Sequence, residues 1–160
     1  MTLPAIHDGP VDRHQPLTSN TFGRLLNYDT AGRLDFINLT TAVEELVEQS
    51  GIRDGIAVIQ SLHSTAGLFV NEWQDALLED FRTLLENVVP LGVPWRHNDP
   101  RYSDCDRGNA SSHLGAALLG TNATLAVRDG RLVRGVWQSI ILVELDGPRT
   151  RTVSVQVVGG

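Results

Sequence analysis

The strand-like segments that follow residue 120 constrain the fold more than any other part of this sequence. Short apolar runs flank Asp129-Gly130, a dipeptide that favours a two-residue turn between antiparallel strands. Two longer segments, 137–145 and 150–158, are joined by a turn signal at 146–148, and the second alternates valine with polar residues. Because hairpins pair consecutive strands in opposite directions, these residues predict a largely antiparallel sheet.

Three segments upstream have the spacing of helices. Residues 40–50 open with a capping-box pattern and stop at Gly51. Residues 71–89 form an amphipathic pattern that begins at a capping asparagine and stops before a proline, and 109–119 form a shorter third pattern. We therefore expect an α+β fold, a single compact domain in which about three helices pack on a largely antiparallel sheet.

The beginning of the chain is expected to differ from the rest. Residues 1–16 are rich in proline and glycine and lack periodicity, which predicts a flexible N-terminal arm, with the α+β domain occupying 17–160. At the start of that domain, segments 18–27 and 33–38 flank a turn signal at 28–32. These two segments are expected to pair as a hairpin.

Composition excludes several classes of protein. There is no run of the roughly 18 apolar residues that a membrane span needs and no secretory signal, so we expect a cytoplasmic protein without a membrane partner. The net charge of −6 argues against nucleic-acid binding. Cys105 is the single cysteine, which excludes an intrachain disulfide and a cysteine-rich zinc site. Its acidic neighbours predict an inert thiol.

All 13 basic residues are arginines. Without lysine, the chain cannot form a Schiff base, hold pyridoxal phosphate covalently or use a P-loop lysine. Any bound anion must therefore be held by arginines, hydroxyls or backbone N–H groups.

Three histidines stand where predicted elements begin or end, and we expect them to converge on one site. His63 follows the apolar strand 56–62 and precedes two hydroxyl residues, and His113 lies in the first turn of a helix, where the helix dipole favours a neutral ring. His97 lies in a polar loop beside Asp99, which is expected to orient it. The plainer alternatives are rings that bond a neighbouring carbonyl or stay solvated.

Other residues add to this site. Glu144, near the end of a strand, is read either as a buried acid facing the site or as a solvated carboxylate. Arg149 and Arg151 stand two apart on one strand, so both project to one face, either to clamp phosphate or to pair on the surface. Trp137 is expected in the core.

Several motifs, in order along the chain, resemble the YjbQ family, also called secondary thiamine-phosphate synthases. The matching segments are His63-Ser64-Thr65-Ala66-Gly67-Leu68 with Asn71-Glu72, Trp95-Arg96-His97-Asn98-Asp99, Asn109 to Leu114, Leu119-Gly120, Val136-Trp137-Gln138 with Glu144, and Asp146-Gly147-Pro148-Arg149. The resemblance covers roughly residues 18 to 158. Many members carry a further histidine two positions before the one that matches His113, where this chain has Ser111.

The resemblance implies a compact α+β fold, a homotrimer and a pocket lined by the motif histidines near subunit contacts. It also implies a secondary ability to join a pyrimidine pyrophosphate to a thiazole phosphate, which makes thiamine phosphate. We expect catalytic roles for His63, His113 and Glu144, substrate binding by Ser64, Thr65, Asn109 and Arg149, and ligation of a divalent metal, zinc or magnesium, by His63, His97 and His113.

Two alternatives remain open at this point. One is metal-assisted hydrolysis of a small phosphate-bearing substrate, with the same imidazoles on zinc and with Glu72 or Glu144 as base. The other is a non-catalytic trimeric module that binds a small anion without turnover. In each case the partners are a small phosphorylated molecule and further copies of the chain.

Overall fold

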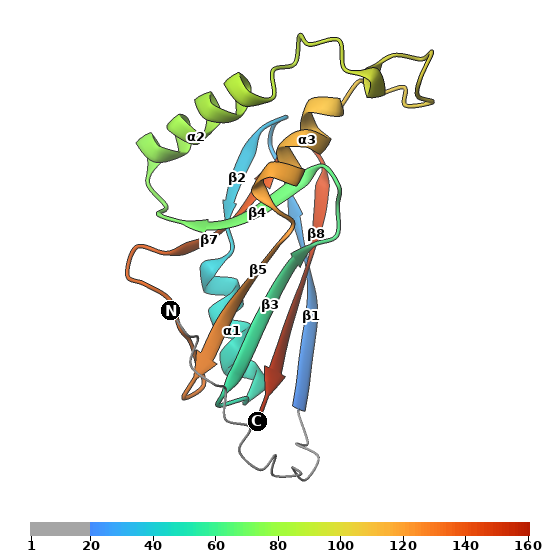
Figure 1. The fold of residues 1–160 in the computed structure, drawn as a ribbon. Helices are drawn as coiled ribbons and strands as arrows, with labels where there is room; N and C mark the ends of the chain where they lie inside the picture. The colour runs from blue at the N-terminus through green and yellow to red at the C-terminus, as the bar shows by residue number, and fades with distance from the viewer. Residues whose placement is uncertain (1–19) are drawn as a thin grey trace, which may run out of the picture.

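The computed structural model describes residues 20–160, so the expected arm at 1–16 lies outside the described residues. Its elements follow one another along the chain as shown in Figure 1. They are β1 (Asn20–Asp29), β2 (Asp35–Asn38), α1 (Thr40–Ser50), β3 (Gly55–Ser61), β4 (Ala66–Asn71), α2 (Asp75–Val88), the 3-10 turn η1 (Arg96–Asn98), α3 (Ala110–Leu119), β5 (Asn122–Arg128), β6 (Arg131–Leu132), β7 (Ser139–Glu144) and β8 (Thr150–Gly159).

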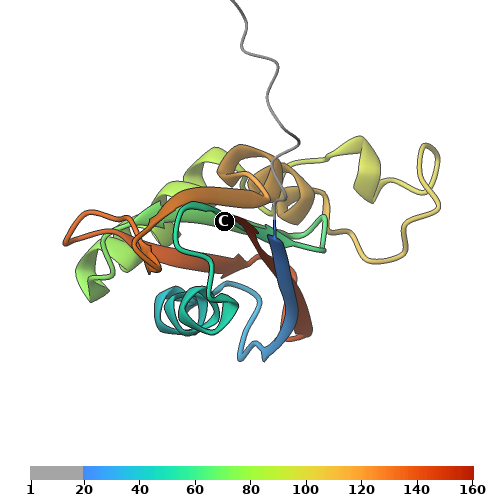
Figure 2. The same cartoon turned by 90° about the horizontal axis from the view of Figure 1, so that it is seen from below.

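The strands form two sheets in which every pairing is antiparallel. One sheet has five strands in the order β1-β8-β3-β5-β6, and the other has three in the order β2-β7-β4. Figure 2 shows α1 on one side of the strands and α2 and α3 on the other. The expected α+β fold with about three helices on antiparallel strands is confirmed.

Only one of the three expected hairpins forms. Asp129 and Gly130, with φ of 51° and 74°, join β5 to β6 as the sequence predicts. The first expected hairpin is wrong, because β1 pairs with β8 and β2 pairs with β7. The last is wrong too, because residues 146–148 carry the chain from β7 in the small sheet to β8 in the large one. A turn signal reverses the chain but does not choose the pairing partner.

Strand β7 is buried on both faces and divides the core in two. Its inward residues Ile140 and Leu142 pack with the valines of β8 and with α1, between the two sheets. Its alternate residues Ile141 and Val143 face α2 and α3. This double burial explains why the strand reads as an apolar run without alternation.

The bounds of α1 match the prediction, whereas the start of α2 does not. Helix α1 ends at Gly51, with φ of 67°, and at its start the Thr40 N–H donates to Asn38 Oδ1 at 3.0 Å. Helix α2 starts at Asp75 rather than Asn71, because the apolar residues 66–71 form strand β4 against β7. The side chain of Gln74 caps it by accepting a hydrogen bond from the Leu77 N–H.

Trp137 is not in the core. It is 72% exposed, on the turn that connects β6 to β7. Gln138 holds that turn through its side-chain oxygen, which accepts from the Gly135 N–H. The indole therefore points out from an ordered turn. Across residues 20–160, no helix is long and apolar enough to cross a membrane.

Candidate functional site

A polar cavity of about 300 Å³ opens where β3, β8 and the start of α3 meet. It gathers most of the residues singled out from the sequence. Its lining comprises Leu62, His63, Ser64, Thr65, Arg107, Asn109, His113, Asp146, Arg149 and Arg151. We call it the polar pocket.

His63 stands between β3 and β4, and its ring is tied to the large sheet. Its Nε2 accepts a hydrogen bond of 2.7 Å from the Thr152 backbone N–H. Burial, together with the nearby Arg151 guanidinium, lowers the pKa of His63 against the opposing effect of Glu144. The ring is therefore held in its neutral form, with its one proton on Nδ1.

Glu144 and Arg151 form a buried ion pair beside the pocket. Arg151 donates from Nε and Nη2 to the two carboxylate oxygens of Glu144, each at 2.6 Å. Thr30 and the backbone N–H groups of residues 145 and 146 complete the carboxylate's partners. Burial raises the pKa of Glu144, but the bonds from Arg151 and from the Asp146 N–H outweigh it and leave that pKa below its ordinary value.

This arrangement argues against the expectation that Glu144 is catalytic. Its side chain is fully buried, it does not line the polar pocket, and both of its oxygens are already bonded. The exposed part of the pair belongs to Arg151, whose Nη2 also donates to Thr65 Oγ1 at 2.9 Å. Glu144 therefore orients the arginine and does not meet a ligand.

A second group of polar residues surrounds Asp146 in the polar pocket. Its carboxylate accepts from Asn109 Nδ2 at 3.0 Å and pairs with Arg149 Nη2 at 2.9 Å, and Arg107 Nη1 stands 3.8 Å away. The guanidinium of Arg149 is further fixed by the backbone oxygen of Asp146. The polar pocket is therefore lined by three arginines and by one carboxylate, that of Asp146.

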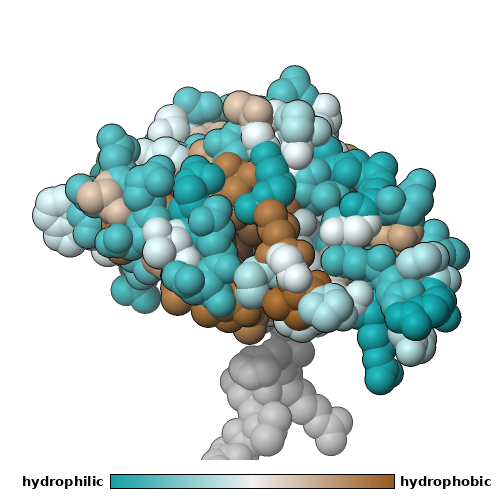
Figure 3. Space-filling view, turned by 90° about the horizontal axis from the view of Figure 1, so that it is seen from above, coloured by the Kyte–Doolittle hydropathy of each residue, from teal (hydrophilic) through white to brown (hydrophobic). Residues whose placement is uncertain are grey.

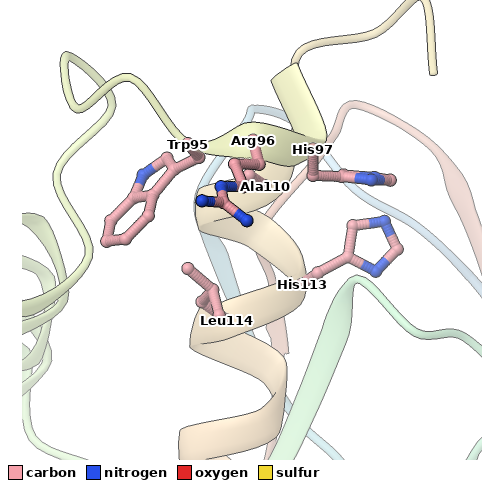
Figure 4. A pocket seen from close by; sticks show the side chains of 6 residues that line it. All are labelled: Trp95, Arg96, His97, Ala110, His113 and Leu114. Atoms are coloured by element: carbon pink, nitrogen blue, oxygen red, sulfur yellow. The ribbon is translucent and has the colours of Figure 1, made fainter. Parts of the chain in front are cut away.

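An apolar pocket of about 350 Å³ adjoins the polar pocket through His113, which lines both. Trp95, Arg96 and His97 form one side, and Ala110, His113 and Leu114 of α3 form the other (Figure 4). Hydrophobic residues also gather in the middle of the face seen from above, between hydrophilic margins (Figure 3). We call this cavity the ring pocket after the indole and the two imidazoles that line it.

His97 and His113 face one another edge to face. Their ring centroids are 5.0 Å apart and their planes meet at 86°. Asp99 does not orient His97 as expected, because its carboxylate is held by Arg101. The partner of His97 Nδ1 is instead Ser103 Oγ, at 3.3 Å.

The three histidines meet on one side of the molecule, but they do not fit a common metal site. Among residues 20–160, no group of three or more His, Cys, Asp or Glu side chains is arranged to hold a metal ion. The ring of His63 already uses Nε2, the lone pair that it would offer a metal, on a backbone N–H.

Of the remaining expected residues, four line the polar pocket and two line neither pocket. Ser64, Thr65, Asn109 and Arg149, the residues expected to bind substrate, line the polar pocket. Glu72 follows the end of β4 that is remote from His63 and lines neither pocket. Ser111 lines neither pocket: it is buried and donates to the Pro90 carbonyl, since positions 111 and 113 lie on different sides of α3.

Sequence reasoning missed Arg107, Asp146, Trp95 and Leu114 as lining residues. Three of them stand in the motif segments and one, Arg107, in the polar stretch before α3. Their position beside the histidines in the sequence was the available signal. Cys105 donates to Asn109 Oδ1 at 3.4 Å, which ties the stretch before α3 to the pocket wall.

Comparison with known proteins places this geometry in a family. The family model described as UPF0047 protein YjbQ-like matches residues 24–160. A UPF0047 protein of Methanothermobacter thermautotrophicus is 42% identical over 81% of this chain and 87% of its own. The protein YugU of Bacillus subtilis, also a UPF0047 protein, is 34% identical over 85% and 98%.

Solved structures agree. A YbjQ-like protein from Sulfolobus solfataricus superposes with a TM-score of 0.83 at 38% identity, covering 89% of this chain and 99% of that one. A hypothetical protein from Aeropyrum pernix gives 0.79 at 34% identity, covering 87% and 99%. With the whole domain matched in both sequence and fold, the chain belongs to the YjbQ/UPF0047 family.

Proposed function

We propose that the two adjoining pockets bind a small molecule that carries phosphate and a planar ring, and that the protein acts as a thiamine-phosphate synthase-like transferase. The carrying observation is that an arginine-lined pocket and an apolar pocket share His113. A molecule with an anionic end and a ring can occupy both at once. The activity itself is carried over from the resemblance to the family.

The polar pocket supports the anionic half of this proposal. Arg107, Arg149 and Arg151 supply positive charge, and Ser64 and Thr65 add hydroxyls. Glu144 cancels much of the charge of Arg151, and Asp146 partly cancels that of Arg149. The buried ion pair fixes Arg151 before any ligand arrives, so a bound phosphate gains contacts without ordering that side chain.

The ring pocket supports the other half. The indole of Trp95 is held by hydrogen bonds of 3.2 Å from its Nε1 to the Pro90 carbonyl and to Ser111 Oγ. The pocket therefore has one rigid aromatic wall and an apolar wall from Leu114. A flat heterocycle is better suited to these walls than a bulky or highly charged group.

The proposed reaction forms a carbon–nitrogen bond between the thiazole nitrogen and the methylene of the pyrimidine. The carbon–oxygen bond to pyrophosphate breaks, and its electron pair leaves with pyrophosphate. The pocket arginines stabilise the charge that develops on this leaving group. His113 lines both pockets and would donate a hydrogen bond from its ring N–H to the departing oxygen, and His97 contacts the ring of His113 edge to face.

The non-catalytic module remains the second candidate. The observation that favours it concerns the two expected carboxylate bases: Glu144 is saturated with hydrogen bonds, and Glu72 lines neither pocket. The same observation weakens the hydrolase alternative. Either way we propose a cytoplasmic protein that assembles as a homotrimer, which is the state that the family resemblance implies.

The test is an assay of thiamine phosphate formation from the two phosphorylated precursors, run beside a generic phosphatase screen. Calorimetric binding of each precursor is measured in parallel. Arg149→Met should weaken phosphate binding and turnover together, whereas Arg128→Met, on the exposed surface of β5, serves as the matched control. Turnover unchanged in Arg149→Met would reject the assigned site, and binding without turnover in the wild type would favour the module.

A further inference from the structure

We propose that His63 serves the polar pocket as a hydrogen-bond donor from Nδ1 to the ligand's anionic group, because the sheet already occupies its Nε2, and not as a metal ligand or a proton carrier. The donor role rests on the proposed function only in that the ligand carries an anion. The protonation state rests on the hydrogen bond to Nε2 and on the charge and burial around the ring. A neutral histidine donates a hydrogen bond to phosphate without adding positive charge to the pocket, whereas a charged histidine adds both.

The first step is the place of the His63 ring in the sheet. Strand β3 pairs with β8 as far as Ser61, opposite Val153. Beyond that point the Leu62 N–H still donates to the Thr152 carbonyl at 3.1 Å. The Thr152 N–H then donates at 2.7 Å to His63 Nε2. The imidazole therefore supplies the acceptor that ends this side of the ladder.

The second step is that a backbone N–H cannot reverse its role. If His63 took up a proton on Nε2, two N–H groups would point at each other across 2.7 Å and the Thr152 N–H would lose its acceptor. Side-chain hydroxyls can rotate to accommodate a protonated ring, but an amide in a strand cannot. The neutral ring with its proton on Nδ1 is therefore the form that is compatible with the hydrogen bond from the Thr152 N–H.

The third step concerns charge around the ring. Arg107, Arg149 and Arg151 line the same pocket, and His113 is the other titratable group with a ring there. The two facing carboxylates are both engaged, Glu144 by Arg151 and Asp146 by Arg149. The pocket therefore offers the imidazolium form of His63 little compensation, and burial opposes it further.

What remains for a ligand is Nδ1–H, a donor with no acceptor capacity. A phosphate oxygen can accept from it at any pH at which the protein is folded, because the donor does not depend on protonation of the ring. A metal ion cannot be ligated by Nδ1–H, because a protonated ring nitrogen has no free lone pair. The contact thus favours oxyanions, adds to the arginines without adding charge, and keeps its strength as pH rises above neutral.

The protonation state can be read directly by nitrogen-15 NMR of histidine-labelled protein, with the His63 signals assigned by their loss in His63→Gln. We expect the neutral tautomer protonated at Nδ1 at pH 8, and a titration midpoint below that of an ordinary histidine. Added zinc should leave these signals in place. An ordinary titration midpoint, an Nε2–H tautomer or a zinc-dependent shift at His63 would each overturn the proposal.

The donor role is tested with inorganic phosphate and pyrophosphate as probes. In His63→Asn the amide stands near the position of Nδ1, and in His63→Gln it reaches the position of Nε2. We expect His63→Asn to keep phosphate affinity within about threefold and His63→Gln to weaken it about tenfold, the usual effect of one lost bond to a charged group. Equal affinities in the two variants would overturn the donor role.

The outcomes separate this inference from the proposed function. If wild-type protein binds phosphate and His63→Gln binds equally well, only the role of His63 fails. If the wild type binds neither phosphate nor pyrophosphate, the anion site and the donor role both fail, while the NMR measurement still decides the protonation state. Circular dichroism of each variant checks folding, and the wild-type spectrum decides the state even if both variants unfold.

Discussion

Glu144 and Arg151 close the core between the two sheets with an ion pair whose two nitrogen–oxygen distances are both 2.6 Å. Glu144 continues the inward row of Ile140 and Leu142 on β7, and Arg151 continues the inward row of Val153 on β8. Each is at most 4% exposed as a side chain. The apolar core thus ends at this ion pair, and Arg151 of the pair lines the polar pocket.

Removing one partner of this pair should be costly. Arg151→Met leaves the Glu144 carboxylate buried without its main partner, and we expect a loss of about 3–5 kcal/mol in the free energy of unfolding. The double variant Arg151→Met with Glu144→Leu should lose less than the sum of the two single variants. Urea denaturation measures all three, and a strictly additive result would contradict coupling between the two residues.

The Glu144–Arg151 pair also predicts how the free energy of unfolding depends on pH. The pKa of Glu144 in the folded protein lies below its ordinary value of 4.5, so its ionised form stabilises the fold above about pH 4.5. That contribution is lost as pH falls through the lowered folded pKa. Urea titrations between pH 7 and pH 3 should show a steeper loss for the wild type than for Glu144→Gln, and equal slopes would count against this carboxylate.

His113→Ala should remove function and leave the fold intact. His113 lies in the first turn of α3, partly exposed between the two pockets, so its loss leaves little cavity. We expect turnover in the precursor assay to fall to background, with thermal unfolding within a few degrees of the wild type. Leu118→Ala, 63% exposed on the same helix, is the control. Retained turnover in His113→Ala would show that the assigned role is wrong.

The ring pocket can be tested separately from the polar pocket. Leu114→Ser removes part of its apolar wall, and we expect phenyl phosphate to bind severalfold more weakly, while inorganic phosphate binds as before. Leu118→Ser changes the same residue type on α3 outside the pocket. Calorimetry with both probes gives the comparison. Equal weakening of the two probes would mean that the wall serves folding and not the ring.

Gly67 sets the distance at which α3 packs on β4. A Cβ at this position would stand 2.8 Å from the Cβ and Cδ1 of Leu119. Gly67→Ala should therefore lower the free energy of unfolding by about 1–3 kcal/mol, as overpacking does. Leu119→Ala removes the close contact with Cδ1 and leaves the one with Cβ, so the double variant should lose less than the sum of the two single variants. A Gly67→Ala protein as stable as the wild type would refute this close packing.

Much of the fold follows from local sequence. The period of apolar residues gives the helices, the left-handed Gly51 ends α1, and Asp129-Gly130 makes the β5–β6 turn, because each depends on neighbours within a few positions. The start of α2 differs from the prediction for the same reason. The apolar residues 66–71 are compatible with a strand or with the segment that leads into a helix. Pairing with β7 makes them a strand.

Strand partners depended on contacts that no local pattern encodes. Turn signals at 28–32 and 146–148 reverse or redirect the chain, yet β1 pairs with β8, and β7 and β8 separate into two sheets. Which strands pair is decided by how the apolar faces can be buried together across the whole domain. The exposed position of Trp137 has the same origin, since residue type predicts average burial and not the place of a turn.

The sequence by itself determined the chemical inventory: arginine without lysine, three histidines at element boundaries, and hydroxyls beside one of them. Tertiary structure alone decided what each group can do. Arg151 consumes both oxygens of Glu144, Thr152 occupies Nε2 of His63, and Arg101 takes Asp99 from His97. Hydrogen-bonding capacity is limited and directional, so a side chain's function depends on which partners the fold has already given it.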